Sequence, residues 1–233
     1  MSNIPTNLLP QYVPFDQTYV LYNPNDIISI ISVQFTLLPI YIMVFYTSWF
    51  LITREIEPVI VVGGHLFSEI LNKVMKKLLK NPRPDFHLQF GGEGTGLNYG
   101  MPSAHSQFIG FFISYFMLII ILKVPKLPIL YKRLSAIAML FVCCGVASSR
   151  VYLQYHTWQQ VFVGVNLGIV IGIFWFLVSS FVRDVGIVDW VLNWRVVKLF
   201  WIKDSYYYNY KSFKDEYDLY IAERKSEKIR KSR

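Results

Sequence analysis

Charge and cysteine are both scarce in this chain. Only 16% of its 233 residues are Asp, Glu, Lys or Arg, whereas 54% are hydrophobic. Soluble domains carry about 25% charged residues, so the low charge excludes an ordinary soluble domain and indicates a polytopic membrane protein. The two cysteines, Cys143 and Cys144, are adjacent within an apolar stretch. This spacing suits neither a disulfide nor a metal site, and we interpret them as small apolar packing residues.

The first 26 residues contain neither Lys nor Arg. A cleavable signal peptide begins with basic residues, whereas the first long apolar run here begins only near Ile27. We therefore expect this run to be a retained membrane helix. Basic residues are concentrated between Arg183 and Arg233. A basic tail can bind nucleic acid, but the apolar spans favour a tail on the cytosolic membrane surface, among membrane lipids.

Five apolar stretches are candidate spans, because a crossing helix needs about 20 apolar residues. They are Ile27–Thr53, Pro58–Leu79, Ser106–Leu122, Leu134–Ser149 and Trp158–Val182. A further stretch, Ile187–Ile202, is apolar and Trp-rich, but its polar residues do not form one clean face. We interpret it as interfacial or packed against the bundle. The predicted fold is an all-α transmembrane helix bundle of five spans, with a sixth helix that is interfacial or spanning.

The positions of Lys and Arg predict the orientation of the bundle. The loop between the third and fourth spans contains Lys123, Lys126, Lys132 and Arg133 and shares a side with the C-terminal tail. We expect this side to be cytosolic. The predicted domain organisation is then a lumenal segment 1–26, a membrane-embedded domain 27–182 and a cytosolic basic tail 183–233. The Gly-rich segment from Asp85 to Gly100 suits the rim of a site on the non-cytosolic side.

Three polar clusters lie at the ends of the spans, all on the predicted non-cytosolic side. They are Lys76 with Arg83-Pro84, Pro102-Ser103-Ala104-His105, and Ser149-Arg150 with His156. Together they supply three cations, a hydroxyl group at a helix start and two histidines. This inventory suits phosphate binding and phosphoryl transfer, and its position indicates that the substrate is met at a membrane surface.

The second cluster opens the third span. A helix start presents free N–H groups and partial positive charge, so a phosphate is well placed there, and Ser103 can add a donor. Ser103 can instead be a simple helix cap. A histidine at membrane depth, such as His105, is costly and is usually functional.

The third cluster requires a turn. A continuous helix would place Arg150 and His156 about 240° apart, so we expect the chain to turn near Tyr152–Tyr155. A neutral histidine can attack phosphorus, and an arginine can bind the phosphoryl oxygens. The alternative is an Arg that reaches the headgroups and a His at the membrane interface.

In the first cluster, Pro82 and Pro84 should end the helix before Arg83, while Lys76 reaches up from its last turn. The alternative is a basic stripe facing lipid headgroups. Within the same span, the carboxylate of Glu69 would be costly unless paired, and Lys73, Lys76 and Asn72 are its candidate partners. We expect His65 to be a buried, hydrogen-bonded residue rather than a catalyst.

In this order, the clusters resemble the signature of the type 2 phosphatidic acid phosphatase superfamily. That signature is Lys, six residues, Arg-Pro; then Pro-Ser-Gly-His; then Ser-Arg, five residues, His, three residues, Asp. The resemblance covers about residues 20–180 and is nearest to the branch that cleaves dolichyl diphosphate in the endoplasmic reticulum. The segments that carry it are Asn81-Pro82-Arg83-Pro84, Tyr99 to Gln107 and Ser149 to Trp158.

The resemblance implies a metal-independent phosphatase that needs no cofactor. Its implied reaction converts dolichyl diphosphate to dolichyl phosphate and inorganic phosphate at the lumenal face, which recycles the lipid carrier of N-glycosylation. On the matching positions, His156 is implied as nucleophile and His105 as general acid. The implied phosphate-binding residues are Lys76, Arg83, Ser103, Ala104 and Arg150. The supporting residues are Glu69, Asn72 and Gln160.

Two positions depart from the superfamily pattern. Ala104 replaces Gly, which is tolerable if its φ is negative. Gln160 replaces the Asp that orients the nucleophilic histidine, and its carbonyl can accept the histidine N–H but cannot stabilise imidazolium as a carboxylate would. A diphosphate needs less of this help, since a lipid phosphate leaves more readily than an alkoxide. Alternatives are a phosphatase for another lipid phosphate and a non-catalytic member that only binds lipid phosphates; a transporter ranks low.

Overall fold

The computed structural model describes residues 20–85, 99–124, 127–206 and 213–231. In these residues the regular structure is helical, apart from one isolated backbone bridge between Glu55 and Lys203. The prediction of an all-α fold is confirmed. The elements are α1 (Ile27–Thr53), α2 (Glu57–Leu79), α3 (Ala104–Leu118) with a π-helical extension η3 (Ile119–Lys123), α4 (Ile129–Tyr152), α5 (Trp158–Asp184), α6 (Ile187–Leu192), α7 (Arg195–Leu199) and α8 (Phe213–Lys231).

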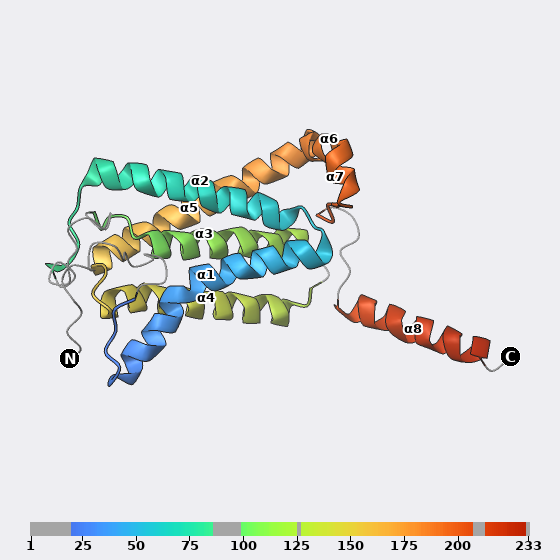
Figure 1. Ribbon diagram of the computed structural model, residues 1–233, viewed down its shortest axis with the longest axis horizontal. Coiled ribbons are helices and arrows are strands. Elements are labelled where there is room, and N and C mark those ends of the chain that lie inside the picture. Colours follow the sequence, from blue (N-terminus) through green and yellow to red (C-terminus); the bar gives the residue numbers. More distant parts are fainter. Residues whose placement is uncertain (1–19, 86–98, 125–126, 207–212, 232–233) are drawn as a thin grey trace, which may run out of the picture.

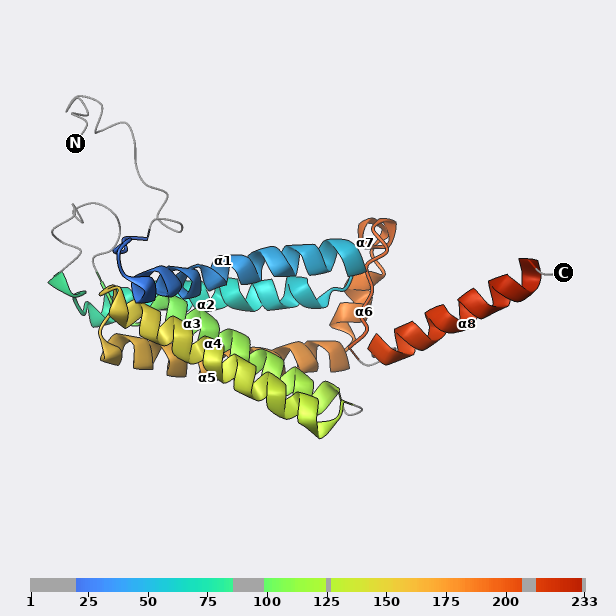
Figure 2. The same cartoon turned by 90° about the horizontal axis from the view of Figure 1, so that it is seen from below.

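The five long helices lie side by side, with α3 in contact with each of α1, α2, α4 and α5 (Figure 1). The connections α2–α3 and α4–α5 lie at one end of the bundle, which we call the α2–α3 end. The connections α1–α2 and α3–α4 and the end of α5 lie at the other, the α1–α2 end. Helix α8 extends away from the bundle beyond the α1–α2 end in both views (Figures 1 and 2).

Four helices in the described part of the chain are long and apolar enough to cross a membrane: α1, α3 with η3, α4 and α5. Helix α2 is not among them by composition, since it is the least apolar of the five. Its 23 residues nevertheless span about 35 Å, which matches a bilayer core of about 30 Å. Because α1 ends at one end of the bundle and α3 begins at the other, α2 must cross between them, as the five-span arrangement predicts.

Glycines bring the backbone of α5 against α3. A Cβ atom on Gly164 would lie 2.7 Å from the carbonyl oxygen of Ser103, and one on Gly168 would overlap the carbonyl oxygen of Gln107. Small residues allow such close helix packing in membranes. The same contact joins the backbones at the α2–α3 end, where the Ser103 N–H donates to the Gln160 carbonyl at 3.2 Å. The start of α3 is therefore fixed against the start of α5.

A buried ionic cluster closes the α1–α2 end. Arg183, near the end of α5, pairs with Glu57 at the start of α2, and its Nε donates to Asp204 at 2.8 Å. The Tyr115 hydroxyl donates to the other oxygen of Glu57 at 2.6 Å. Because Asp204 is held here, the intervening segment folds back as the short helices α6 and α7 and does not span. Helix α6 contacts α5, whereas most of the apolar side chains of Ile187–Ile202 are exposed, which is consistent with the prediction of an interfacial or packed segment.

We expect Arg183→Ala to destabilise the protein strongly, because it leaves the buried Glu57 carboxylate unpaired. Loss of one partner of a buried ion pair costs about 3–5 kcal/mol. A thermal melt in detergent should show a marked drop in unfolding temperature. The control is Arg195→Ala, which removes an exposed arginine just beyond this cluster and should leave the melt unchanged. Equal melts for both variants would contradict the structural role of this pair.

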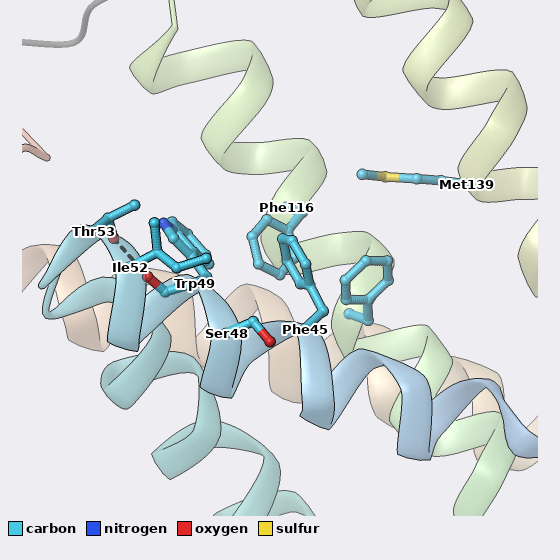
Figure 3. A pocket seen from close by; sticks show the side chains of 8 residues that line it. Phe45, Ser48, Trp49, Ile52, Thr53, Phe116 and Met139 are labelled. Atoms are coloured by element: carbon cyan, nitrogen blue, oxygen red, sulfur yellow. Dashed lines mark hydrogen bonds between the residues drawn. The ribbon is translucent and has the colours of Figure 1, made fainter.

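An apolar hollow of about 510 Å³ lies between α1, α3 and α4, towards the α1–α2 end (Figure 3). The only hydroxyl groups among its lining residues belong to Ser48 and Thr53, and that of Thr53 donates within α1 to the carbonyl oxygen of Trp49 at 2.8 Å. The other lining residues are Phe45, Trp49, Ile52, Phe112, Phe116 and Met139. The hollow therefore offers an almost entirely apolar surface, and the polar clusters lie elsewhere.

Candidate active site

The structure brings the three polar clusters together at the α2–α3 end of the bundle. Lys76 lies in the last turn of α2, and Arg83 follows in the segment after it. His105 is in the first turn of α3. Arg150 is near the end of α4, and His156 lies between α4 and α5. Five side chains that are up to 80 positions apart in the sequence thus share one site.

The turn between α4 and α5 sets the relation between Arg150 and His156. Helix α4 ends at Tyr152, and Gln154 adopts a left-handed backbone with φ of 57°. The N–H groups of Tyr155 and His156 both donate to the carbonyl oxygen of Arg150, at 3.0 and 3.1 Å. The predicted turn near Tyr152–Tyr155 is confirmed. It reverses the chain within one helical turn and places His156 on the same side as Arg150.

Gln160 determines which nitrogen of His156 carries the proton. The Gln160 Oε1 atom accepts from the backbone N–H of Thr157 at 3.2 Å, while its Nε2 donates to the backbone carbonyl of Pro82 at 2.7 Å. These two backbone partners fix the orientation of the carboxamide. Since Oε1 also lies 3.1 Å from His156 Nδ1, that nitrogen must be the donor. The other ring nitrogen, Nε2, then carries a lone pair.

The surroundings keep His156 neutral. Its side chain is buried, with 3% exposure, and burial is the main factor that holds its pKa well below the usual value. The positive charges of Arg150 and Arg83 lower the pKa further, and the Gln160 contact opposes them weakly. A neutral imidazole with a free Nε2 lone pair is the form that can attack phosphorus.

The cations of the site have no acidic partner in the described part of the chain. Among the described residues, neither Lys76, Arg83 nor Arg150 forms an ion pair, although all three lie within electrostatic range of one another. The Nε atoms of Arg83 and Arg150 are buried without a hydrogen-bond partner in the described structure. Burial lowers the pKa of Arg83 to about 10, so it still carries its charge at neutral pH. Cations without an acidic partner are suited to bind an anion.

The start of α3 lies within electrostatic range of the same three cations. Ser103 is the N-cap residue and is fully buried, but its hydroxyl makes no capping bond and instead accepts from the Ser106 hydroxyl at 3.0 Å. The Ser103 hydroxyl therefore does not cap the helix, and in this hydrogen bond it is the acceptor rather than the donor. The Ala104 N–H lies in the first helical turn, where it has no intrahelical partner. Ala104 has a negative φ, so its methyl group introduces no strain.

A sequence profile of the PAP2 superfamily matches residues 57–184, which include all three clusters. This chain belongs to the PAP2 superfamily. It is 42% identical to the Dolichyldiphosphatase of Saccharomyces cerevisiae, with 91% of this chain and 89% of the relative covered. It is 32% identical to the Dolichyldiphosphatase 1 of Homo sapiens, with 82% of each chain covered.

The fold of the superfamily is also found among solved structures. The crystal structure of a transmembrane PAP2 type phosphatidylglycerolphosphate phosphatase from Bacillus subtilis superposes with a TM-score of 0.51. It covers 70% of this chain and 80% of that chain, at 22% identity. At this identity the match supports the helical PAP2 arrangement and leaves substrate choice to other observations.

The supporting residues of this PAP2 site differ in what they contact. Asn72 is buried, and its Nδ2 donates to Gln107 Oε1 at 2.7 Å and to the Pro102 carbonyl at 3.2 Å. It therefore holds the segment that leads into Ser103. Glu69 pairs with Lys73 at 3.8 Å on an exposed surface. Of its three candidate partners, Lys73 is the one it contacts.

His65 is outside the site, as the sequence predicts. It is buried, lies 3.2 Å from the Tyr46 hydroxyl through Nε2, and stacks on Phe108 with ring centroids 3.8 Å apart. Residues 86–98 of the predicted rim lie outside the described part of the chain, so that prediction stays open.

Two contacts of Arg150 are not evident from the motifs. Its guanidinium lies over the Tyr155 ring, 4.1 Å from the centroid, and its NH1 donates to the Thr36 hydroxyl at 3.4 Å. Tyr155 lies within the segment Ser149–Trp158, but the sequence does not indicate that its ring contacts Arg150. Thr36 lies in the middle of an apolar helix, where a lone hydroxyl group gives no signal in sequence. Both contacts hold the guanidinium in the site without neutralising it.

Proposed function

We propose that this protein is a dolichyl diphosphate phosphatase that releases inorganic phosphate and leaves dolichyl phosphate in the membrane. The observation that carries this proposal is the buried, neutral His156 near Arg83 and Arg150, neither of which forms an ion pair with any residue that the structure describes. Its context supports the choice of substrate, because the relatives named Dolichyldiphosphatase match this chain over more than four fifths of both lengths.

The geometry supports a two-step reaction. Lys76, Arg83 and Arg150 bind the oxygens of the terminal phosphate, with the Ser103 hydroxyl and the Ala104 N–H as further donors. The lone pair on His156 Nε2 forms a bond to the terminal phosphorus. The bond from phosphorus to the bridging oxygen breaks, and its electron pair leaves with dolichyl phosphate. The proton stays on Nδ1, hydrogen-bonded to Gln160 Oε1, and the positive charge spreads over the ring.

His105 is the proposed acid and base of the two steps. In its protonated form it donates a proton to the departing lipid phosphate, and the neutral imidazole that results then takes a proton from the water that attacks the phosphorus. The bond between phosphorus and His156 Nε2 breaks, its electron pair returns to the imidazole, and inorganic phosphate is released. The cations of the site stabilise the phosphoryl group in both steps, so the proposed reaction requires no metal ion.

We also propose that the site faces the lumen of the endoplasmic reticulum and that the basic tail is cytosolic. The α1–α2 end of the bundle is close to the basic loop residues Lys123, Lys132 and Arg133, and the basic tail leaves from the same end. Positive residues favour the cytosolic side. The clusters lie at the opposite end, which supports a lumenal site that recycles the carrier of N-glycosylation.

The test of the proposed function is phosphate release by purified protein in detergent containing EDTA. Dolichyl diphosphate, dolichyl monophosphate, phosphatidate and a sphingoid phosphate should be compared at equal surface concentration. We expect the highest kcat/KM for dolichyl diphosphate and no effect of EDTA. Preferential cleavage of phosphatidate or the sphingoid phosphate would contradict the assignment of substrate, and loss of activity with EDTA would contradict the metal-independent reaction.

A second expected outcome concerns His105. Replacing it by Ala should reduce cleavage of dolichyl diphosphate less than cleavage of a lipid monophosphate, because a lipid phosphate leaves without full protonation whereas an alkoxide does not. General acid catalysis contributes about 100- to 10,000-fold, so the monophosphate reaction should lose most of that amount. The measurement is kcat/KM for both lipids in His105→Ala. Equal losses on the two lipids would contradict the role of His105 as the acid for the leaving group.

A further inference from the structure

The carboxamide of Gln160 joins two parts of the site through opposite atoms. Its Oε1 accepts from His156 Nδ1 and from the Thr157 N–H, at 3.1 and 3.2 Å. Its Nε2 donates to the Asn81 side-chain oxygen at 2.6 Å and to the Pro82 carbonyl at 2.7 Å. Pro82 directly precedes Arg83, so one side chain connects the histidine to the segment that carries a cation.

The space around this carboxamide is closed. Gln160 is fully buried, and a Cβ atom added to Gly100 would lie 2.5 Å from its Oε1 and 2.6 Å from its Nε2. The Gly100 N–H also donates to the Asn81 backbone carbonyl at 2.8 Å. The carboxamide therefore has no room to rotate. Backbone groups fix both ends of the carboxamide: the Thr157 N–H fixes Oε1, and the Pro82 carbonyl fixes Nε2.

We propose that Gln160 is a positioning and specificity residue, and that a neutral carboxamide is required there. Its donor side holds the Asn81–Arg83 segment against His156, and its acceptor side holds the Nδ1 proton without adding negative charge. This inference rests on the proposed function, and it names the feature of the site that restricts it to diphosphates. A carboxylate in the same place would put an oxygen against the Pro82 carbonyl, which has no proton to offer.

The specificity follows from the charge that develops on His156. When Nε2 bonds to phosphorus, the ring becomes positive, and a carboxylate next to Nδ1 would stabilise it. The Gln160 oxygen offers only a dipole, which stabilises the positive ring less than a carboxylate would. The reaction therefore requires a leaving group that departs readily. Dolichyl phosphate is a weak base and departs readily, whereas the alkoxide of a monophosphate is a strong base. A neutral partner at this position therefore favours diphosphate substrates.

The charged groups around His156 come from several neighbouring elements. Arg150 of α4 and Arg83 of the segment after α2 both disfavour a positive ring, and His105 of α3 adds a smaller effect. Lys76 of α2 lies within range of both arginines. Tyr155 of the α4–α5 turn contacts the Arg150 guanidinium through its ring. The charged side chains of this set are all cationic, and a glutamate at 160 would be its sole acidic group.

The test is Gln160→Glu, with Gln159→Glu as the matched control. Gln159 is the neighbouring residue of α5 and is exposed, so the control adds the same charge at the same helix end. We expect Gln160→Glu to lose about 100-fold in kcat/KM on dolichyl diphosphate at neutral pH, because the Arg83 segment is displaced. The acid limb of the pH profile should move up by about one unit or more, because the carboxylate favours protonated His156.

The diphosphate-to-monophosphate ratio of kcat/KM should fall by about tenfold in Gln160→Glu, which is the effect of one pKa unit on the stability of the positive ring. Gln159→Glu should change none of these quantities. A uniform loss on both lipids with an unmoved acid limb would indicate a purely structural role and would overturn the proposal. So would wild-type behaviour of Gln160→Glu.

Two further measurements keep the proposal separate from the proposed function. Nitrogen NMR of histidine-labelled protein, with His156 assigned from His156→Asn, should show the Nδ1–H form in wild type and a raised pKa in Gln160→Glu. This readout requires no substrate, so inactivity of the wild type on dolichyl diphosphate would refute the function while the NMR result still decides the role of Gln160.

If Gln160→Glu does not fold, Asn81→Ala should lower kcat/KM and leave the acid limb in place. Retention of full activity in Asn81→Ala would overturn the proposal.

Discussion

Replacing His156 by Ala should abolish phosphate release from dolichyl diphosphate. Removal of a nucleophile together with the step it performs costs about 10,000-fold or more in kcat. The loss should be in kcat and not in binding, because Lys76, Arg83 and Arg150 remain to hold the phosphate. The measurement is phosphate release under saturating lipid, with binding of the lipid to the variant followed separately.

The matched control for His156→Ala is His65→Ala, which removes a second buried histidine. His65 contacts Tyr46 and Phe108 rather than the cations. We expect His65→Ala to lower the unfolding temperature and to retain kcat in the folded fraction. A His156→Ala protein that hydrolyses the lipid within tenfold of wild type would contradict the assigned nucleophile.

Loss of Arg150 should have the second-largest effect. Arg150→Met should reduce kcat/KM by about 100- to 1,000-fold, the cost of removing one preorganised group that stabilises the transferred charge. Arg150→Lys should recover only a small part, because a lysine keeps the charge but not the paired N–H groups. It also lacks the planar group that lies over Tyr155. The control is Arg133→Met, at the far end of the same helix and exposed.

The pH profile gives a second readout for Arg150. The charge of Arg150 lowers the pKa of His156, so its removal should raise that pKa. His156 would then be protonated, and inactive as a nucleophile, up to a higher pH. The acid limb of kcat/KM should therefore move to higher pH in Arg150→Met and stay in place in Arg133→Met. An acid limb that moves to lower pH, or a loss of activity as large in Arg133→Met, would contradict this arrangement.

Much of the site could be predicted because the placement of its residues depends on local sequence patterns. The turn that brings Arg150 and His156 together follows from their spacing, since no helix could place both on one side. The end of α2 follows from Pro82 and Pro84, and Lys80 does adopt the left-handed cap there. Long apolar runs predict α1, α3, α4 and α5, because length and hydropathy are enough in a membrane.

The long-range contacts could not be predicted in the same way. Gln160 and Asn81 are 79 positions apart, and nothing in either segment marks the other as its partner. Arg183 and Glu57 are 126 positions apart, and each reads alone as an ordinary charged residue at a helix end. Ser103 looks like a helix cap because the sequence shows its position but not the direction of its hydroxyl. Such contacts depend on how helices pack, which single-sequence patterns do not encode.

The most direct test of the account is to trap the phosphorylated enzyme. Purified protein in EDTA should be mixed with dolichyl diphosphate carrying radiolabelled terminal phosphate, quenched in alkali within milliseconds, and digested to locate the label. We predict an alkali-stable, acid-labile label on the peptide that contains His156, formed in wild type and absent from His156→Ala. Rapid hydrolysis with no trapped label, or a label on any other residue, would contradict the proposed nucleophile and the mechanism built on it.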